Sequence, residues 1–428
     1  MNFFIKKKEF KSGLKLVYQQ NPLAHKSIFQ VYVNVGSLIE DKKSLGICHL
    51  VEHLMFKSTK TKTTEEISVE LEKCGANINA YTTFDSTCFH YISSHKNFKK
   101  CMEIFADMIL NKNISEEEFK KEKEVVIQEY YMYQDQPDAV NISNYFEKFY
   151  KWKDIIGEVD VLKEITLDDV NNFIQQNYIL NNMTISIISN KPYLYIKNLV
   201  KDLFNADNKH WNVNAVINSV CKSYTDNKWN SLKLSPVVYS NKTIKINKDT
   251  AQVQIMTGYP VKVNNIMELD YINFLLSKGL SSVIYRHLRE KKGLFYGCSV
   301  TADYFFNDVV NAKYGTGLSI ISSTDLPNVN KYMTSLKKVM KELKTIINDD
   351  DVERVNNQIV DLKYSLFGNA TYNAFYFNDK NVPSYARSIK KLGKLKLDDV
   401  RTLLDFWFNS FDNLKPNTMM LGNFDKKN

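Results

Sequence analysis

Two histidines and a glutamate at helical spacing are the residues of this sequence best suited to chemistry. His49, Glu52 and His53 lie within residues 46–57, which read GICHLVEHLMFK. The apolar residues after the glycine predict a helix, on which positions i and i+4 share a face and position i+3 lies beside them. His49 and His53 can then hold one metal ion, and Glu52 can act on a nearby water. The order H-x-x-E-H is the inverted zincin motif.

The alternative is that these are ordinary polar residues on a half-exposed helix. The chain has only seven histidines in 428 residues, so a chance match to the motif is rare. Both histidines also sit among apolar residues, where polar groups without partners are costly. These two observations favour the metal site.

The composition predicts a globular protein without a membrane span. The length suggests about two to three domains, and the hydrophobic content of 44% is ample for packed cores. The sequence lacks a run of about 18 apolar residues, which a spanning helix would need. The N-terminal text MNFFIKKKEF does not fit a secretory signal. We therefore expect a cytoplasmic protein.

The charge and the cysteine content argue against a nucleic-acid partner and against an oxidising compartment. The net charge of +9 comes from lysines spread along the chain without a nucleic-acid-binding motif, so we expect solvated surface lysines and no nucleic-acid partner. The six cysteines form no C-x-x-C pair, which predicts free thiols in a reducing compartment. Cys48 precedes His49, but one helical step turns it about 100° away, so we exclude it as a ligand.

The elements around the motif are strands and capped helices. Residues 14–19 and 27–35 read as strands before the motif helix, and residues 77–82 and 86–93 read as strands after it. Capping-box pairs open two further helices, the second of which runs from about residue 116 to residue 133. These pairs are Thr63 with Glu66 and Ser115 with Glu118.

A zinc site needs a third protein ligand, and the helix at residues 116–133 offers one. Glu129 is the candidate, and Glu122 lies seven residues earlier on the same helical face. Spacing alone leaves the other acids of this helix open as ligands.

Residues 31–135 resemble the catalytic domain of the pitrilysin–insulysin family of zinc metallopeptidases. The matching segments are VNVGSLIE, LGICHLVEHLMFKST, CGANINAYTTFDST and EKEVVIQEYYMYQDQPD. The resemblance implies one Zn²⁺ per chain, held by His49, His53 and Glu129. It also implies that Glu52 is the general base and that Glu122 is a carboxylate behind the ligands.

The resemblance implies a substrate-binding edge strand as well. A peptide would add to this strand through its backbone, which tolerates many sequences. The strand residues are Asn79, Ala80, Tyr81 and Thr82. Two departures from the family pattern are Cys48, where a small residue is usual, and Ser58, where glycine is usual. Cys48 places a thiol near the site.

The second half lacks the metal motif but resembles the family's second signature. Residues 278–296 read KGLSSVIYRHLREKKGLFY. Arg289 and Tyr296 match residues that contact substrate near the scissile bond, whereas without the resemblance they read as a helix-surface arginine and a strand-start tyrosine. His287 is expected to be a surface residue.

Strands followed by paired helices occur in both halves, which indicates an α+β fold. The polar tract at residues 205–236 separates a catalytic zinc-binding domain (1–220) from a second domain without metal (221–428). The resemblance implies two similar domains, each a mostly antiparallel sheet packed against helices, forming half of a clamshell. A homodimer is expected, and a heterodimer with a related subunit is the alternative.

The resulting hypothesis is a zinc-dependent metalloendopeptidase that cleaves short or unfolded peptides, for example as a processing peptidase. One rival is a non-catalytic peptide-binding or assembly subunit of a heteromeric peptidase complex. The other rival, a basic nucleic-acid-binding protein, has only the net charge in its favour.

Overall fold

The computed structural model describes residues 5–208, 237–264, 266–303, 317–365, 368, 370–374, 385–408 and 414–425. The chain forms two compact units. Unit 1 comprises Met1–Tyr131, Lys153–Lys233 and Ser365–Lys380, and unit 2 comprises Met132–Trp152, Leu234–Tyr364 and Asn381–Asn428. The predicted boundary near residue 220 lies outside the described residues, so the domain ranges 1–220 and 221–428 stay predictions.

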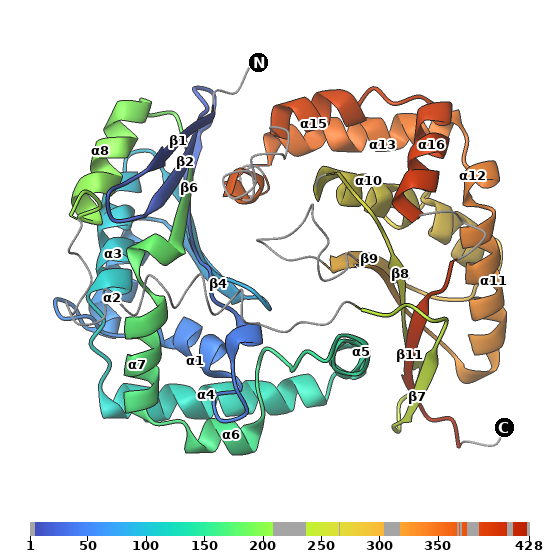
Figure 1. Ribbon diagram of the computed structural model, residues 1–428, viewed down its shortest axis with the longest axis horizontal. Helices are drawn as coiled ribbons and strands as arrows, with labels where there is room; N and C mark the ends of the chain where they lie inside the picture. The colour runs from blue at the N-terminus through green and yellow to red at the C-terminus, as the bar shows by residue number, and fades with distance from the viewer. Residues whose placement is uncertain are drawn as a thin grey trace. The chain divides into compact units, whose positions relative to one another are not determined.

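Unit 1 is built on a six-stranded sheet in the order β1-β2-β6-β3-β5-β4 (Figure 1). Neighbouring strands are antiparallel except β2 and β6, which are parallel. Strand β4 lies at one edge and, among the strands that the structure describes, pairs with β5 alone. The strands are β1 (Ile5–Glu9), β2 (Lys15–Gln20), β3 (Lys26–Val33), β4 (Asn77–Thr82), β5 (Thr87–Ser94) and β6 (Met183–Ser189).

Helices cover one face of this sheet. Helix α3 (Phe98–Leu110) packs on β5, and α8 (Tyr193–Leu203) packs on β2 and on α3. Apolar side chains of the sheet and of these helices form one buried core. The other helices that begin in this unit are α1 (Ile47–Leu54), α2 (Thr64–Lys73), α4 (Glu116–Gln134), α6 (Val159–Glu164) and α7 (Leu167–Asn177).

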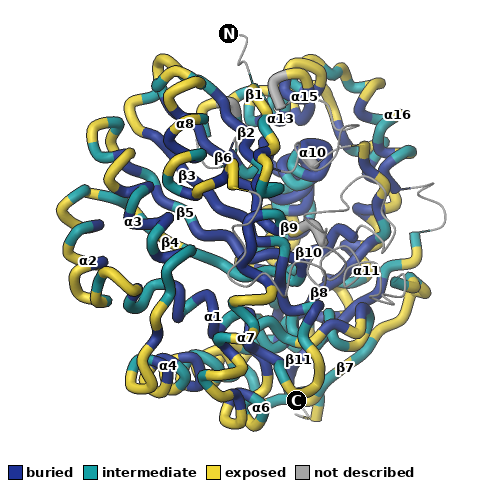
Figure 2. The backbone as a smooth tube through the Cα atoms, turned by 60° about the vertical axis from the view of Figure 1, so that its left-hand side comes forward, coloured by how far each residue is buried: buried dark blue, intermediate teal, exposed yellow. Residues whose placement is uncertain are grey.

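A segment from late in the sequence covers the other face of the same sheet. The Ser186 hydroxyl donates to the Ala370 carbonyl at 2.6 Å, and the Gln30 amide donates to the Thr371 hydroxyl at 3.1 Å. Asn373 donates to Gln19 at 2.8 Å. Covered on both faces, β3 and β5 are largely buried (Figure 2).

Unit 2 repeats this plan with a five-stranded sheet in the order β7-β11-β8-β10-β9. Strands β11 and β7 are parallel, and the other neighbours are antiparallel. The strands are β7 (Thr243–Asn247), β8 (Val253–Pro260), β9 (Cys298–Asp303), β10 (Gly317–Thr324) and β11 (Asn417–Gly422). The helices are α10 (Ile266–Leu276), α11 (Val329–Lys341), α12 (Leu343–Ile346), α13 (Asp349–Asp361), α15 (Tyr385–Leu392) and α16 (Leu397–Phe408). Two mostly antiparallel sheets with packed helices confirm the predicted α+β class.

A helix from the first half of the sequence belongs to unit 2. Helix α5 (Pro137–Tyr145) packs on β8 and β11. A Cβ at Gly258 in β8 would stand 1.7 Å from the Tyr145 hydroxyl oxygen, so only glycine permits this approach. Each unit therefore contains one segment from the opposite half of the sequence: Ser365–Lys380 in unit 1 and Met132–Trp152 in unit 2.

From the sequence alone, residues 267–291 read as one continuous helix, and this prediction is wrong. Helix α10 ends at Leu276, and a separate π-helical turn spans Tyr285–Glu290. Gly279 between them has φ +93°, a left-handed conformation that interrupts a right-handed helix. Within the described residues, no helix is long and apolar enough to cross a membrane.

Candidate metal centre

Helix α1 is anchored at its first turn. The backbone N–H groups of Gly46 and Cys48 each donate to the Glu40 carboxylate at 2.8 Å, which satisfies two N–H groups that an isolated helix would leave unpaired. Gly46 has φ +91°, and a Cβ there would stand 2.6 Å from the Ile156 carbonyl oxygen. These contacts fix the start of the helix that carries the motif.

The apolar side of α1 fixes the direction of its polar side. Leu50, Val51 and Leu54 are fully buried in the core of unit 1. His49 and His53 therefore lie together on the remaining face, with their ring centroids 4.7 Å apart.

Helix α4 brings Glu129 to these two rings. Its Oε2 atom lies 3.8 Å from His49 Nε2 and 3.3 Å from His53 Nε2. One ligand atom of each of the three residues falls within 4.8 Å of the others. Two imidazole nitrogens and one carboxylate oxygen are a donor set that zinc prefers, and three protein ligands leave a position for water or substrate. The residues present therefore fit zinc.

The pKa values of the two histidines are shifted in opposite directions. Burial, together with the neighbouring His53, lowers the pKa of His49 to about 4. Burial also disfavours the charged form of His53, but the Glu122 and Glu129 carboxylates outweigh it and raise the pKa of His53 to about 9. Near neutral pH, the metal-free pair thus carries its proton on His53.

Zinc binding is expected to release this proton, because zinc binds the neutral imidazole. A pKa raised to about 9 means that His53 is protonated below that pH, so the apparent zinc affinity should fall as the pH falls from about 9 toward 6. We expect about one proton released per zinc at pH about 6.5. Calorimetric zinc titrations in buffers of different ionisation enthalpy measure this number, and a value near zero would contradict the assigned protonation.

Glu52 is held beside these residues by the substrate-strand candidate. Its side chain is buried, and its Oε2 atom accepts a 2.6 Å hydrogen bond from the Thr82 hydroxyl at the end of β4. Burial raises the pKa of Glu52, and the bond from Thr82 opposes that rise. The sequence placed Thr82 in the edge strand but gave no signal for this contact, because the two residues are 30 positions apart.

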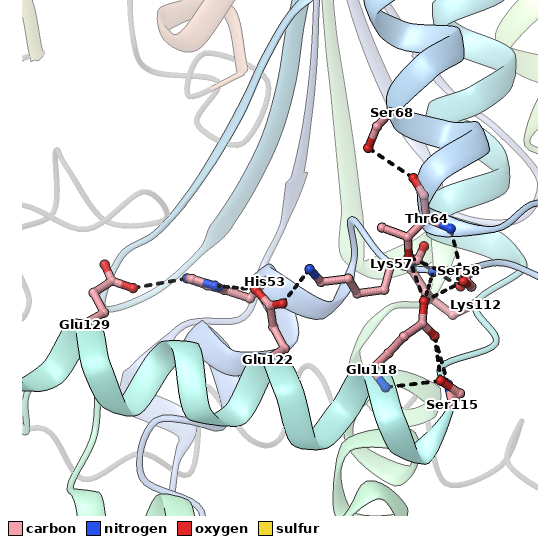
Figure 3. Close-up of polar contacts among 10 residues, drawn as sticks. All are labelled: His53, Lys57, Ser58, Thr64, Ser68, Lys112, Ser115, Glu118, Glu122 and Glu129. Atoms are coloured by element: carbon pink, nitrogen blue, oxygen red, sulfur yellow. Dashed lines mark hydrogen bonds and ion pairs between the residues drawn. The ribbon is translucent and has the colours of Figure 1, made fainter.

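Glu122 lies behind His53 and is nearly buried. Its Oε1 atom is 3.1 Å from His53 Nδ1, and its Oε2 atom is 2.5 Å from the Lys57 ammonium (Figure 3). Burial acts to raise the pKa of Glu122, but the bonds to His53 and Lys57 hold it below its usual value. Sequence reasoning missed Lys57, which lies three residues after the end of α1 at Leu54 and so is not placed by the spacing of the helix.

The remaining candidates are placed as follows. Asn79, Ala80 and Tyr81 lie in edge strand β4, where the Tyr81 hydroxyl is 3.1 Å from that of Tyr32. Cys48 is fully buried in the core.

In unit 2 the structure brings Arg289 and Tyr296 together. The Arg289 guanidinium carbon lies 5.1 Å from the centre of the Tyr296 ring and 5.5 Å from that of Tyr285, within the range of cation–π attraction. Tyr296 is 82% exposed, so its hydroxyl is open to a ligand. Their contact with substrate stays a prediction.

The two histidines and the glutamate form a donor set that fits zinc, and comparison with known protein families identifies the family of this chain. Residues 15–156 match the model described as "Insulinase (Peptidase family M16)", and residues 164–359 match the one described as "Peptidase M16 inactive domain". The chain belongs to the M16 family, which is the pitrilysin–insulysin family. Its cofactor is zinc.

Relatives that are named zinc proteases match most of this chain. An "Uncharacterized zinc protease" of Rickettsia bellii is 26% identical over 84% of this chain and 82% of its own length. The "Uncharacterized zinc protease YmxG" of Bacillus subtilis is 26% identical over 78% of this chain and 79% of its own length. A mitochondrial-processing peptidase subunit beta of Neurospora crassa is 27% identical, but over 41% of this chain and 38% of its own length.

A solved structure shows the same fold. "The crystal structure of a protease from Helicobacter pylori" has a TM-score of 0.80 at 22% identity and covers 98% of this chain and 100% of its own.

Proposed function

We propose that this chain is a zinc-dependent metalloendopeptidase that cleaves short or unfolded peptides. The observation that carries the proposal is the convergence of His49, His53 and Glu129 beside a buried, hydrogen-bonded Glu52. Relatives of similar length that are named zinc proteases support it. A non-catalytic assembly subunit would not need such a set of ligands and base.

The proposed roles follow from the chemistry of each group. When bound, zinc supplies Lewis-acid polarisation of a carbonyl and acidification of water. Glu52 takes a proton from the attacking water as its oxygen adds to the peptide carbonyl carbon, and then gives that proton to the amine as the C–N bond breaks. The raised pKa of Glu52 favours its holding the proton between these two steps. Glu122 orients His53 through Nδ1.

The substrate is proposed to bind as an extended strand along β4, whose outer edge has no partner strand among the described residues. Backbone pairing at Asn79–Thr82 requires an unfolded segment and tolerates many sequences. Arg289 and Tyr296 are proposed to anchor the same substrate. The free cysteines among the described residues support a reducing compartment, and we place the enzyme in the cytoplasm as part of this proposal.

A peptide-library digest tests the proposal and reads the cleavage specificity at the same time. The zinc-loaded chain is expected to yield internal cleavage products by mass spectrometry, and the Glu52→Gln variant, purified identically, controls for contaminating peptidases. A zinc-loaded wild-type chain that cleaves nothing beyond this control would contradict the endopeptidase assignment.

We further propose a two-fold homodimer in which the metal ligands of one chain act with Arg289 and Tyr296 of its partner. Two inactive variants, Glu52→Gln and Tyr296→Phe, should then complement each other on mixing. Random exchange makes roughly half the dimers mixed, and each mixed dimer has one intact site, so roughly a quarter of the wild-type activity should return. If no activity returned despite proven subunit exchange, Arg289 and Tyr296 would act in the site of their own chain or with a different partner.

A further inference from the structure

Lys57 contacts the metal centre through Glu122. The Glu122 carboxylate uses one oxygen for His53 Nδ1 at 3.1 Å and the other for Lys57 Nζ at 2.5 Å. Figure 3 shows Glu129, His53, Glu122 and Lys57 in one row along α4. With Nδ1 engaged by Glu122, His53 presents Nε2 toward Glu129, 3.3 Å away. The orientation of this ligand therefore depends on where the Glu122 carboxylate is held.

The Lys57 ammonium pairs with the oxygen of this nearly buried carboxylate that His53 does not contact. The two side chains are 23% and 10% exposed. A buried carboxylate with an unpaired oxygen is unfavourable, and a charge-assisted bond fixes its rotamer more firmly than a neutral one would. Removing the ammonium leaves Glu122 free to turn toward water and away from His53.

The residues at Lys57 and Ser58 are themselves held by hydrogen bonds to α4 and to Lys112, which precedes α4 in the sequence. The Lys57 carbonyl accepts from the Lys112 ammonium at 2.5 Å. The Ser58 hydroxyl donates to Glu118 at 2.5 Å, and Glu118 lies one turn before Glu122 on α4. Glu118 and Glu122, from two successive turns of α4, therefore contact the residues that follow α1. These contacts fix the backbone that carries the Lys57 side chain.

His49 offers a contrast. Among the described residues, no group hydrogen-bonds its buried Nδ1 atom. Of the two ligand rings, His53 is the one whose Nδ1 atom is held by a described side chain, and Glu122 and Lys57 lie on that side.

We propose that Lys57 is a positioning residue for the zinc centre: it holds Glu122 where Glu122 orients His53. This inference builds on the proposed zinc site and adds a residue to it. Positioning and direct electrostatics predict opposite changes in zinc affinity when the Lys57 ammonium is removed. A cation near Zn²⁺ repels the metal, so by electrostatics alone its removal would tighten binding. Positioning requires the opposite, since loss of an outer-shell partner typically weakens metal binding about 10- to 100-fold.

The test is a double-mutant cycle read as zinc affinity, measured by competition with a chelating dye. Lys57→Met is expected to weaken zinc binding about tenfold, and Lys57→Gln serves in the same way if the first variant does not fold. In the Glu122→Gln background, Lys57→Met should weaken binding no further, because the carboxylate that it positions is already gone. The visible spectrum of bound Co²⁺ should also change in Lys57→Met, because the geometry of the ligand set is altered.

Lys62→Met is the matched control. Lys62 also pairs with a glutamate, Glu70, and is 25% exposed, but among the described residues this pair makes no hydrogen bond or ion pair with a metal ligand. The control should keep wild-type zinc affinity and the wild-type Co²⁺ spectrum. Unchanged or tighter zinc binding in Lys57→Met, or an equal loss in both Glu122 backgrounds, would overturn the inference. A wild-type chain that binds no zinc would instead overturn the proposed function on which it depends.

Discussion

Glu52→Gln is expected to abolish measurable peptide cleavage while zinc stays bound. General acid–base catalysis by one side chain contributes about 10²- to 10⁴-fold, so kcat should fall by at least that range. The amide has nearly the same shape as the carboxylate, and its oxygen can still accept the 2.6 Å bond from Thr82. It cannot accept the proton of the attacking water, so the chemical step is lost without loss of structure.

The measurement pairs kcat with zinc content on the same sample. Retained zinc with lost turnover assigns Glu52 to the chemical step. Full peptidase activity in Glu52→Gln would show that another group is the base, and lost zinc would show that Glu52 supports the metal rather than the proton transfer.

Replacing any ligand should remove zinc and activity together. His49→Ala, His53→Ala and Glu129→Gln each delete one of three donors, and each is expected to weaken zinc binding by more than about 100-fold, the upper range for an outer-shell change. Glu122→Gln should act more mildly, within about 10- to 100-fold, because it alters only the orientation of His53.

Zinc titration of these variants separates a ligand from its support. Glu124→Gln is the matched control, since Glu124 is an exposed acid on the same helix α4. It should bind zinc like the wild type. If Glu129→Gln kept wild-type affinity, Glu129 would leave the ligand set and another acid of α4 would become the candidate.

Local patterns predicted much of the scaffold of the site. The motif helix is present as Ile47–Leu54, and α4 spans Glu116–Gln134 where residues 116–133 were expected. Both capping boxes are present, with Thr63 bonded to Glu66 and Ser115 bonded to Glu118. Such features depend on residues a few positions apart, so hydrophobic periodicity and helix-capping residues predict them.

Contacts between distant parts of the chain could not be predicted in this way. The bond between Thr82 and Glu52 and the pair of Lys57 with Glu122 join residues 30 and 65 positions apart. The helix α5 that Gly258 admits lies in the other half of the sequence. Spacing alone also left several acids of α4 as third ligands, and only the family resemblance selected Glu129.

We propose that this chain is a peptidase whose zinc is held by His49, His53 and Glu129. This proposal is tested most directly by adding zinc stepwise to metal-free wild-type protein and following peptide cleavage. The activity should rise from near zero in proportion to added zinc and level off at about one zinc per chain, as a single three-ligand site requires. Full activity before any zinc is added, or no activity at saturation, would contradict the claim.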